Sequence, residues 1–475
     1  MTVFSFFILF SIFYFCTKER RTSINEIYIN VTALAIALEV MISIGYFIKI
    51  KGIDIGFSEV LIILDVAVCF LIIAKRQAIN SVLFPKGMVL IIACVLSLFM
   101  QVIYPYNGGV VSAEANWDLY YFYGQYPEKI TLGMNHFKEI IHVVCYVIVM
   151  TQFFSLNRSL KQRLLSQTFV CCKPFIWYGL FEFFMVKVMH AREILTNTQI
   201  AIFGNSYIND AGIISLGVED RLRGLKSEPS MYGFALFTFF CLAVYLAITK
   251  KEKTQYRIYA VISFILMVFS KSFTAVVCSA IILVFGLLFV YEKGDDMTKK
   301  ILIISMIIGF VFAFLLIWFF YKYSFESYYF KRIHLALVNM SDLSIDGWTG
   351  DYSSTDASTK VRMISIVGSL KYFLSRPLLG VGLGSTYAHS TMATMLASIG
   401  TFGTVAWYLF TFKYCHYKGM MYIIITLIWC VALVLLSNGL FPFYGIQNII
   451  FASFFSLYSV EENRKKNSGI SSDLA

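Results

Sequence analysis

Charged residues are scarce in this chain. They make up 14% of its 475 residues, whereas 59% are hydrophobic; a soluble domain has about 25% charged residues. Only seven residues are proline, and no low-complexity tract or internal repeat divides the chain. The composition excludes a soluble globular domain and a disordered chain, because this much apolar surface cannot be left in water. It predicts a membrane protein.

Sequence motifs of common soluble enzymes are also missing. Nearly all of the ten cysteines lie in or at the end of apolar runs, which excludes a disulfide framework and a C-x-x-C metal site. The six histidines show no metal-binding spacing, and there is no Walker loop or G-x-S-x-G motif. We therefore expect neither a metal nor a cofactor.

Long apolar segments are abundant. A membrane-spanning helix needs about 20 apolar residues. The apolar stretch from 255 to 291 is too long for one helix, so we interpret it as a hairpin with Lys271 at its tip. The sequence predicts an all-α polytopic membrane protein with about 13 transmembrane helices, at 2–16, 27–48, 57–74, 82–104, 136–155, 164–189, 229–249, 255–270, 272–291, 301–321, 386–412, 419–437 and 443–460.

The basic residues indicate how the chain is oriented. Lys and Arg accumulate in short cytoplasmic loops, and every second loop is basic when the N-terminus is outside and the C-terminus inside. These inner loops hold 20 Lys and Arg against 7 Asp and Glu, which leaves 19 against 21 in the rest of the chain. The net charge of +11 therefore comes from topology, and nucleic acid binding is not expected.

Three predicted outer loops are long, at about 105–135, 190–228 and 322–385. Function is expected in them, and the last is large enough to hold short helices. We predict one membrane domain over 1–460 and a disordered cytoplasmic tail over 461–475.

The second long loop ends in a basic cluster, Arg221-Leu-Arg223-Gly224-Leu-Lys226-Ser-Glu228-Pro229-Ser230. One interpretation is an interfacial anchor whose cations reach toward the lipid head groups. The positive-inside rule disfavours such a cluster on the outer side, which favours a functional role. Pro229 suits the first position of the helix that follows.

The third long loop ends in a second candidate region. Lys360 and Arg362 precede an apolar-periodic stretch, which predicts a helix on the outer leaflet. Arg376 and the glycines of Gly380-Val-Gly382-Leu-Gly384 follow. The glycines resemble half of a dinucleotide fingerprint without its strand, so a close approach of backbone to a neighbour or a substrate is the favoured interpretation.

His389 comes next, at the outer end of a predicted span. It is either a hydrogen-bonded residue of the bundle or a catalytic group. Glu39, Asp65 and Glu182 are isolated acids within predicted spans, and each either pairs inside the bundle or marks a pathway.

Three segments together resemble the O-antigen polymerase and O-antigen ligase superfamily of bacterial membrane glycosyltransferases. They are the basic cluster at 221–230, Ser270-Lys271-Ser272-Phe-Thr274, and Arg376-Pro377-Leu-Leu-Gly380-Val-Gly382-Leu-Gly384-Ser-Thr-Tyr-Ala-His389. The resemblance covers about 215–412. It implies a fold of the GT-C type and a place in the bacterial inner membrane. Where ligases often have Asn-Pro-Asn, this chain has Glu228-Pro229-Ser230, which favours a Wzy-type polymerase of O-antigen, capsule or exopolysaccharide.

The resemblance also implies roles for individual residues. Arg221 and Arg362 would hold the diphosphate of an undecaprenyl-linked glycan, and His389 would activate the acceptor hydroxyl, with Glu228 as the reserve base. Further residues predicted to bind substrate are Arg223, Lys226, Lys271, Lys360, Arg376, Gly382 and Gly384.

The predicted reaction transfers the growing glycan from undecaprenyl diphosphate to a new lipid-linked repeat unit. Undecaprenyl-diphosphate-linked oligosaccharides and membrane lipid are the expected ligands. A chain-length-regulating co-polymerase and a repeat-unit flippase are further implied partners. The alternatives are an O-antigen ligase that transfers glycan to lipid A core, and a flippase or transporter of lipid-linked oligosaccharide.

Overall fold

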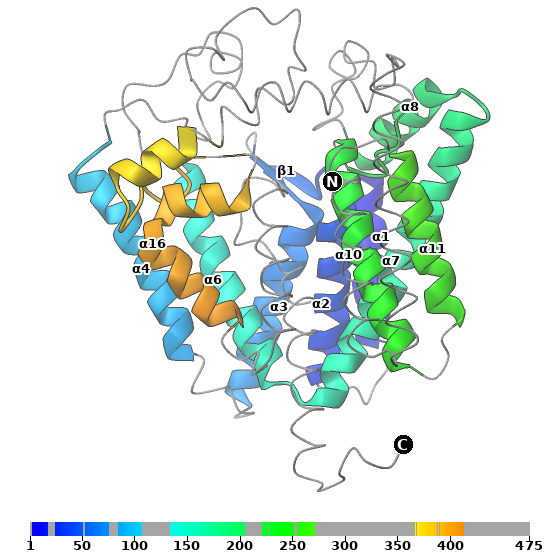
Figure 1. Ribbon diagram of the computed structural model, residues 1–475. Helices are drawn as coiled ribbons and strands as arrows, with labels where there is room; N and C mark the ends of the chain where they lie inside the picture. The colour runs from blue at the N-terminus through cyan, green and yellow to red at the C-terminus, as the bar shows by residue number, and fades with distance from the viewer. Residues whose placement is uncertain are drawn as a thin grey trace, which may run out of the picture.

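The computed structural model is mostly helical, with its longer helices roughly parallel (Figure 1). Seven of the described helices are long and apolar enough to cross a membrane. They are α2 (Ile24–Met41), α3 (Phe57–Ala74), α4 (Phe84–Ile103), α6 (Met134–Ser155), α7 (Arg158–Lys187), α10 (Pro229–Thr249) and α16 (Thr391–Phe412). The structure describes residues 2–17, 24–50, 53–75, 84–106, 134–204, 221–226, 228–250, 254–270, 366, 368–386, 388 and 390–412.

The remaining described elements are shorter. Helices α1 (Val3–Thr17) and α11 (Thr254–Phe269) match two predicted spans but are only 15 and 16 residues long. The predicted spans at 272–291, 301–321, 419–437 and 443–460, and the hairpin tip at Lys271, lie outside the described residues.

Two segments depart from the prediction. Within the predicted span 27–48 the helix ends at Met41, and the N–H groups of Ser43 and Ile44 donate to the carbonyl of Leu225 instead of continuing it. The chain turns at Gly45 (φ +81°), where any side chain would collide with the backbone of Phe203. It then forms a hairpin of β1 (Ile48–Ile50) and β2 (Ile53–Ile55), which pair antiparallel with Ile48 opposite Ile55. The predicted loop 190–228 contains helix α8 (Arg192–Phe203).

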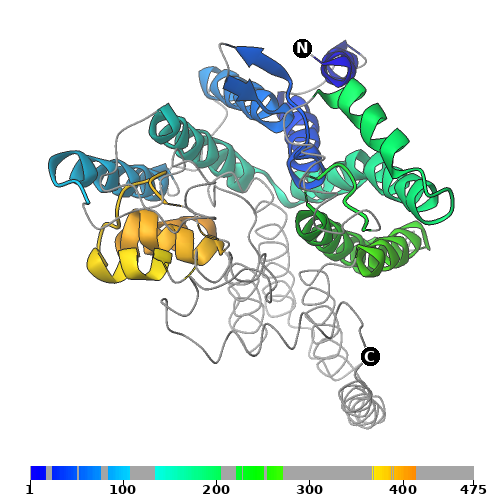
Figure 2. The same cartoon turned by 90° about the horizontal axis from the view of Figure 1, so that it is seen from above.

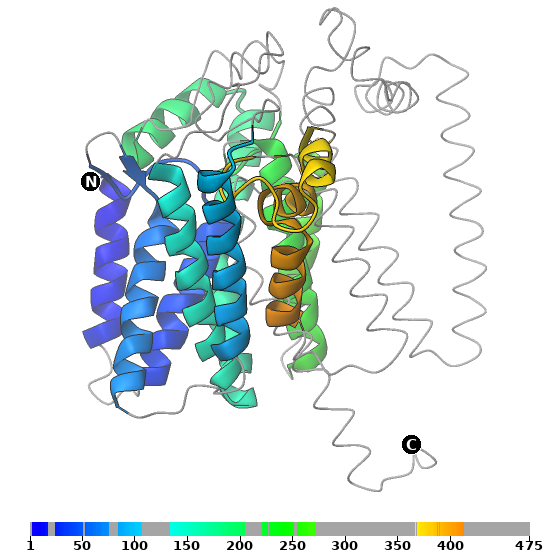
Figure 3. The same ribbon diagram turned by 90° about the vertical axis from the view of Figure 1, so that its left-hand side faces the viewer.

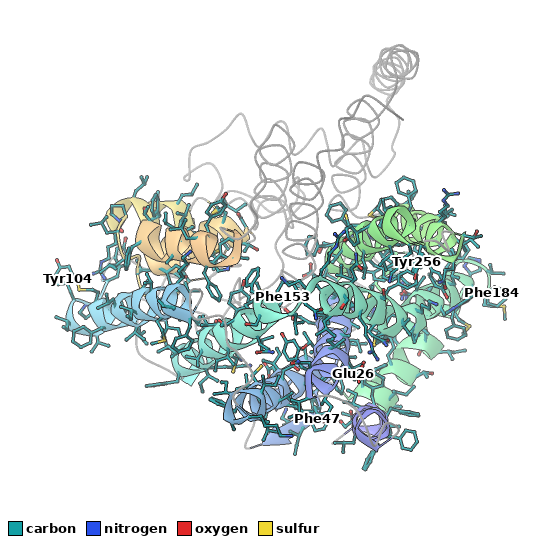
Figure 4. All side chains as sticks on the ribbon, turned by 90° about the horizontal axis from the view of Figure 1, so that it is seen from below. Glu26, Phe47, Tyr104, Phe153, Phe184 and Tyr256 are labelled. Carbon is teal, nitrogen blue, oxygen red and sulfur yellow. The ribbon has the colours of Figure 1, made fainter. Side chains whose placement is uncertain are left out.

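The helices form a continuous row of contacts, seen from above in Figure 2. It runs α16, α4, α6, α3, α2, α7, α10, and α11 contacts both α10 and α7. The side view in Figure 3 shows α1 to α4 standing parallel. In the view from below, Phe153 of α6 lies near the middle of the row, while Tyr104 and Phe184 lie near its opposite sides (Figure 4).

Helix α2 is packed closely on several sides because its small residues admit neighbouring helices. Ala33, Ala35 and Ala37 are fully buried, and small side chains let helix backbones approach within a membrane. Other helices of the row also expose large apolar side chains, such as Phe70 of α3 and Phe99 of α4. These faces suit lipid, since a helix satisfies its own backbone hydrogen bonds without water.

Candidate functional site

The two regions singled out in the sequence lie at the same end of the bundle. The basic cluster leads into the start of α10, and the glycine segment leads into the start of α16; both helices begin at the upper end in Figures 1 and 3. The regions contact different helices, and α10 and α16 lie on different sides of the row (Figure 2). The structure thus groups the sequence candidates into two sets.

The first set is built around the carboxylate of Glu182, near the end of α7. Its Oε1 lies 2.6 Å from Nη1 of Arg192 and accepts a hydrogen bond from the backbone N–H of Arg223 at 3.1 Å. Its Oε2 accepts from the backbone N–H of Gly224 at 2.6 Å. A second nitrogen of Arg192, Nη2, donates to the carbonyl oxygen of Arg221. One buried acid therefore ties α7, α8 and the basic loop together.

The side chain of Arg223 is turned into the protein. It is 3% exposed, and its Nη2 donates to Oε1 of Gln199 at 3.0 Å. Gln199 in turn donates to the carbonyl oxygen of Gly224 at 3.2 Å and to the hydroxyl of Tyr178 at 2.6 Å. These contacts hold the loop against α8, so binding of substrate by Arg223 stays a prediction.

Lys226 is also buried, at the end of α2. Its Nζ donates to the carbonyl oxygens of Glu39 at 2.7 Å and of Ile42 at 3.3 Å. The carbonyls of a last helical turn have no partner within the helix, so the ammonium satisfies groups that would otherwise be orphaned. Burial lowers the pKa of Lys226 to about 8, and the nearby Glu39 carboxylate opposes that shift. Its predicted contact with substrate likewise stays a prediction.

Arg221 and Glu228 are the more accessible members of this set. The side chain of Arg221 is half-buried, whereas Glu228 is exposed at the N-cap of α10 and accepts a hydrogen bond from the hydroxyl of Ser230 at 2.9 Å. Pro229 occupies the first turn of α10, as the sequence predicted. The loop thus encloses two cations and leaves one partly open to the surroundings.

The second set depends on a kink in α16. Gly400 has φ +63° and ψ −170°, which interrupts the helix. The carbonyls before the kink accept hydrogen bonds from the glycine segment, Val381 N to Ala397 O at 2.7 Å and Gly382 N to Ser398 O at 3.0 Å. A side chain on Gly380 would lie 2.4 Å from the Ala397 carbonyl oxygen. The glycines therefore allow the close backbone approach that the sequence indicated.

Gly384 and Ser385 rest on the first turns of α6. Nε2 of His136 lies 3.2 Å from the hydroxyl of Ser385, and both side chains are buried. A Cβ on Gly384 would lie 3.1 Å from Cγ of Glu139. Glu139 also faces His142, with 3.7 Å between Oε1 and Nδ1. The segment that precedes His389 in the chain is thus seated on a polar face of α6.

Arg376 extends this set toward α4. Its Nη1 donates to Oε1 of Gln101 at 3.2 Å, and its Nη2 donates to the carbonyl oxygen of Tyr104 at 2.6 Å. The guanidinium also lies over the rings of Tyr104 and Tyr106, at 5.0 and 5.4 Å from their centroids. Its positive charge is therefore placed among aromatic faces that attract cations.

Four sequence candidates, Arg362, His389, Lys271 and Lys360, lie outside the described residues. The described residues contain no group of three or more His, Cys, Asp or Glu that could hold a metal ion.

Several residues that hold the two sets together were not predicted to have a role. Glu182 was visible as an acid within a span, but its partner Arg192 lies in a stretch predicted as loop. His136 was visible as a histidine at a span end, without a sign of Ser385. Gln199 carried no signal at all.

The chain was compared with known proteins at three levels. No protein-family model, no curated protein and no solved structure matches it.

Proposed function

We propose that the protein is a bacterial polysaccharide polymerase, a membrane glycosyltransferase that uses undecaprenyl-diphosphate-linked donors. The observation that carries the proposal is the basic loop before α10, where Arg221 is half-buried while Arg223 and Lys226 are enclosed by protein groups. A loop held in shape by two buried cations can present the third to an anionic ligand. The family resemblance of the same residues supplies the ligand, a lipid-linked diphosphate.

The proposed reaction needs a cation near the leaving group. The acceptor hydroxyl oxygen forms a bond to C1 of the growing glycan, the bond from C1 to the diphosphate oxygen breaks, and undecaprenyl diphosphate leaves with the bonding electrons. Arg221, together with Arg362, would stabilise the negative charge that develops there. A guanidinium can form two parallel hydrogen bonds to phosphate oxygens, which makes arginine suited to this task.

The acceptor hydroxyl must also lose its proton. We assign this step to His389, with Glu228 as the reserve base. Glu228 is exposed at the N-cap of α10, two residues after Lys226, and accepts a hydrogen bond from the hydroxyl of Ser230. Its exposed carboxylate lies outside the buried contacts that hold the loop, which supports its choice as the reserve base.

The inner membrane is the proposed location, with the N-terminus outside. The seven apolar helices support a membrane-embedded chain. The proposed orientation places the starts of α10 and α16 outside, where lipid-linked repeat units are polymerised in the pathway that the resemblance implies.

Replacement of Arg221 tests the proposal. In a strain that lacks the gene, Arg221→Ala is expected to abolish long-chain polysaccharide on a gel at normal protein levels. Arg257→Ala removes an exposed arginine in the first turn of α11, outside both sets, and should leave the ladder intact. Normal ladders from Arg221→Ala, Arg362→Ala and His389→Ala alike would refute the assigned site.

The product distinguishes polymerase from ligase and flippase. If the repeat is delivered to lipid A core, loss of a polymerase leaves a single repeat attached, whereas loss of a ligase leaves none. Purified protein supplied with lipid-linked repeat units should lengthen the chains without other proteins, which a flippase cannot do.

A further inference from the structure

We propose that Arg192 and the backbone N–H groups of Arg223 and Gly224 form an anion-binding site, which the chain fills with its own Glu182 carboxylate. This internal anion holds the basic loop in shape and makes Glu182 a positioning residue for Arg221. The positioning role rests on the proposed function, but the anion site does not.

The geometry is that of an anion-binding nest. The N–H groups of two successive residues, Arg223 and Gly224, point to the two oxygens of one carboxylate, at 3.1 and 2.6 Å. Successive N–H groups converge in this way when a residue adopts the left-handed conformation, and Gly224 has φ +58°. A side chain there would also collide with the ring of Tyr232, at 2.4 Å.

The site also matches the negative charge of the Glu182 carboxylate. The Glu182 side chain has no exposed surface, and its carboxylate forms an ion pair with the Arg192 guanidinium at 2.6 Å. A buried carboxylate is costly unless it is paired and hydrogen-bonded, and here three donors satisfy it. An amide would be a poor substitute, because its NH₂ group would face one of these N–H donors.

Arg192 transmits the effect to Arg221. Nη1 of Arg192 binds Glu182, while Nη2 of the same guanidinium donates to the carbonyl oxygen of Arg221. The orientation of this planar group is therefore set by the carboxylate, and the backbone position of Arg221 is set by the guanidinium. Loss of the carboxylate releases both.

Chemical rescue tests the anion site. Glu182→Ala removes the atoms of one acetate molecule, so acetate can refill the site, whereas acetamide has nearly the same shape without the charge. We expect the purified Glu182→Ala protein to have a lower Tm than wild type, and acetate to raise it by about 2 °C or more. Acetamide at equal concentration and ionic strength should have no such effect. Glu193→Ala, which removes the same atoms from an exposed position on α8, is the matched control.

Three results would overturn the anion site. They are an unchanged Tm for Glu182→Ala, equal effects of acetate and acetamide on that variant, or a rise with acetate in wild type or Glu193→Ala as large as the rise in Glu182→Ala. If Glu182→Ala cannot be purified, Glu182→Gln is used instead, because glutamine has nearly the same volume as glutamate. Its Tm is compared with that of Glu193→Gln. A Tm that is lowered in Glu182→Gln but not in Glu193→Gln supports the anion site, and equal Tm values for the two variants overturn it.

A chain-extension assay tests the positioning role separately. Misplacement of a binding group by about 1 Å can cost about a hundredfold in rate, so Glu182→Ala should lose activity on that scale and regain part of it with acetate. If acetate restores the Tm of Glu182→Ala but not its activity, and the wild type is active, the anion site is supported and the positioning role is overturned. A wild-type protein that extends no chains overturns the proposed function, while the Tm comparison still decides the anion site.

Discussion

Nζ of Lys226 lies 2.7 Å from the carbonyl oxygen of Glu39, so the loop before α10 is fastened to the last turn of α2. The backbone strengthens this connection, since the N–H groups of Ser43 and Ile44 both donate to the carbonyl of Leu225, at 2.9 and 3.3 Å. Residues 187 positions apart in the chain, Glu39 and Lys226, are thereby held together. The loop that carries Arg221 is consequently part of the packed bundle.

The buried ammonium of Lys226 predicts a pH dependence of stability. The pKa is about 8 in the folded protein and 10.5 for the ordinary side chain. Between these values the unfolded chain binds more protons, so the free energy of unfolding rises with pH. A neutral amine still has two hydrogens for the two carbonyls and no charge to bury. We expect the Tm of wild type to rise relative to that of Lys226→Met from pH 8 to pH 10, measured by thermal melting in detergent. A difference between the two proteins that does not vary with pH would contradict this.

The kink in α16 predicts that Gly400 cannot be replaced. A Cβ at this position would lie 2.3 Å from the carbonyl oxygen of Leu378, and the backbone conformation is nearly exclusive to glycine. Gly400→Ala should lower the free energy of unfolding by about 1–3 kcal/mol or more. Gly56→Ala is the control, because the atoms nearest its Cβ are at 3.7 Å and its φ is −70°. Equal Tm values for the two variants would show that the kink is not a constraint.

The contact between His136 and Ser385 predicts an energetic coupling between α6 and the glycine segment. His136→Ala and Ser385→Ala each break the 3.2 Å hydrogen bond, so the double variant should lose less stability than the two single changes added together. The expected coupling is about 0.5–1.5 kcal/mol from equilibrium unfolding. Ser263→Ala on α11, whose hydroxyl donates to carbonyls of its own helix, should combine additively with His136→Ala. Strict additivity in both pairs would mean that the contact carries no stability.

Much of the membrane architecture followed from the sequence, because helices in lipid obey local rules. The predicted bounds 57–74 and 229–249 match α3 and α10, and Pro229 opens α10 as expected. A span needs only enough consecutive apolar residues, since its backbone hydrogen bonds are internal. The seven described spans are a confirmed part of the predicted architecture, while the 13-helix total and the GT-C fold stay predictions.

The sequence identified candidate site residues but did not indicate which of them would be buried. A basic cluster in a predicted outer loop marked Arg221, Arg223 and Lys226, but nothing local showed that two of them would be enclosed. The end of α2 at Met41 was likewise missed, because the N–H groups that would continue the helix, those of Ser43 and Ile44, donate to the carbonyl of the distant Leu225.

The sequence by itself determined that this chain contains apolar helices long enough to cross a membrane, where several of them lie, and which polar segments deserve a functional hypothesis. Only the tertiary structure decided that Glu182 binds Arg192 and the N–H groups of Arg223 and Gly224, and that the kink at Gly400 receives the glycine segment. The reason is physical: hydropathy is a sum over neighbours in the chain, whereas a buried charge or an orphaned carbonyl is satisfied by whichever group the packing brings to it.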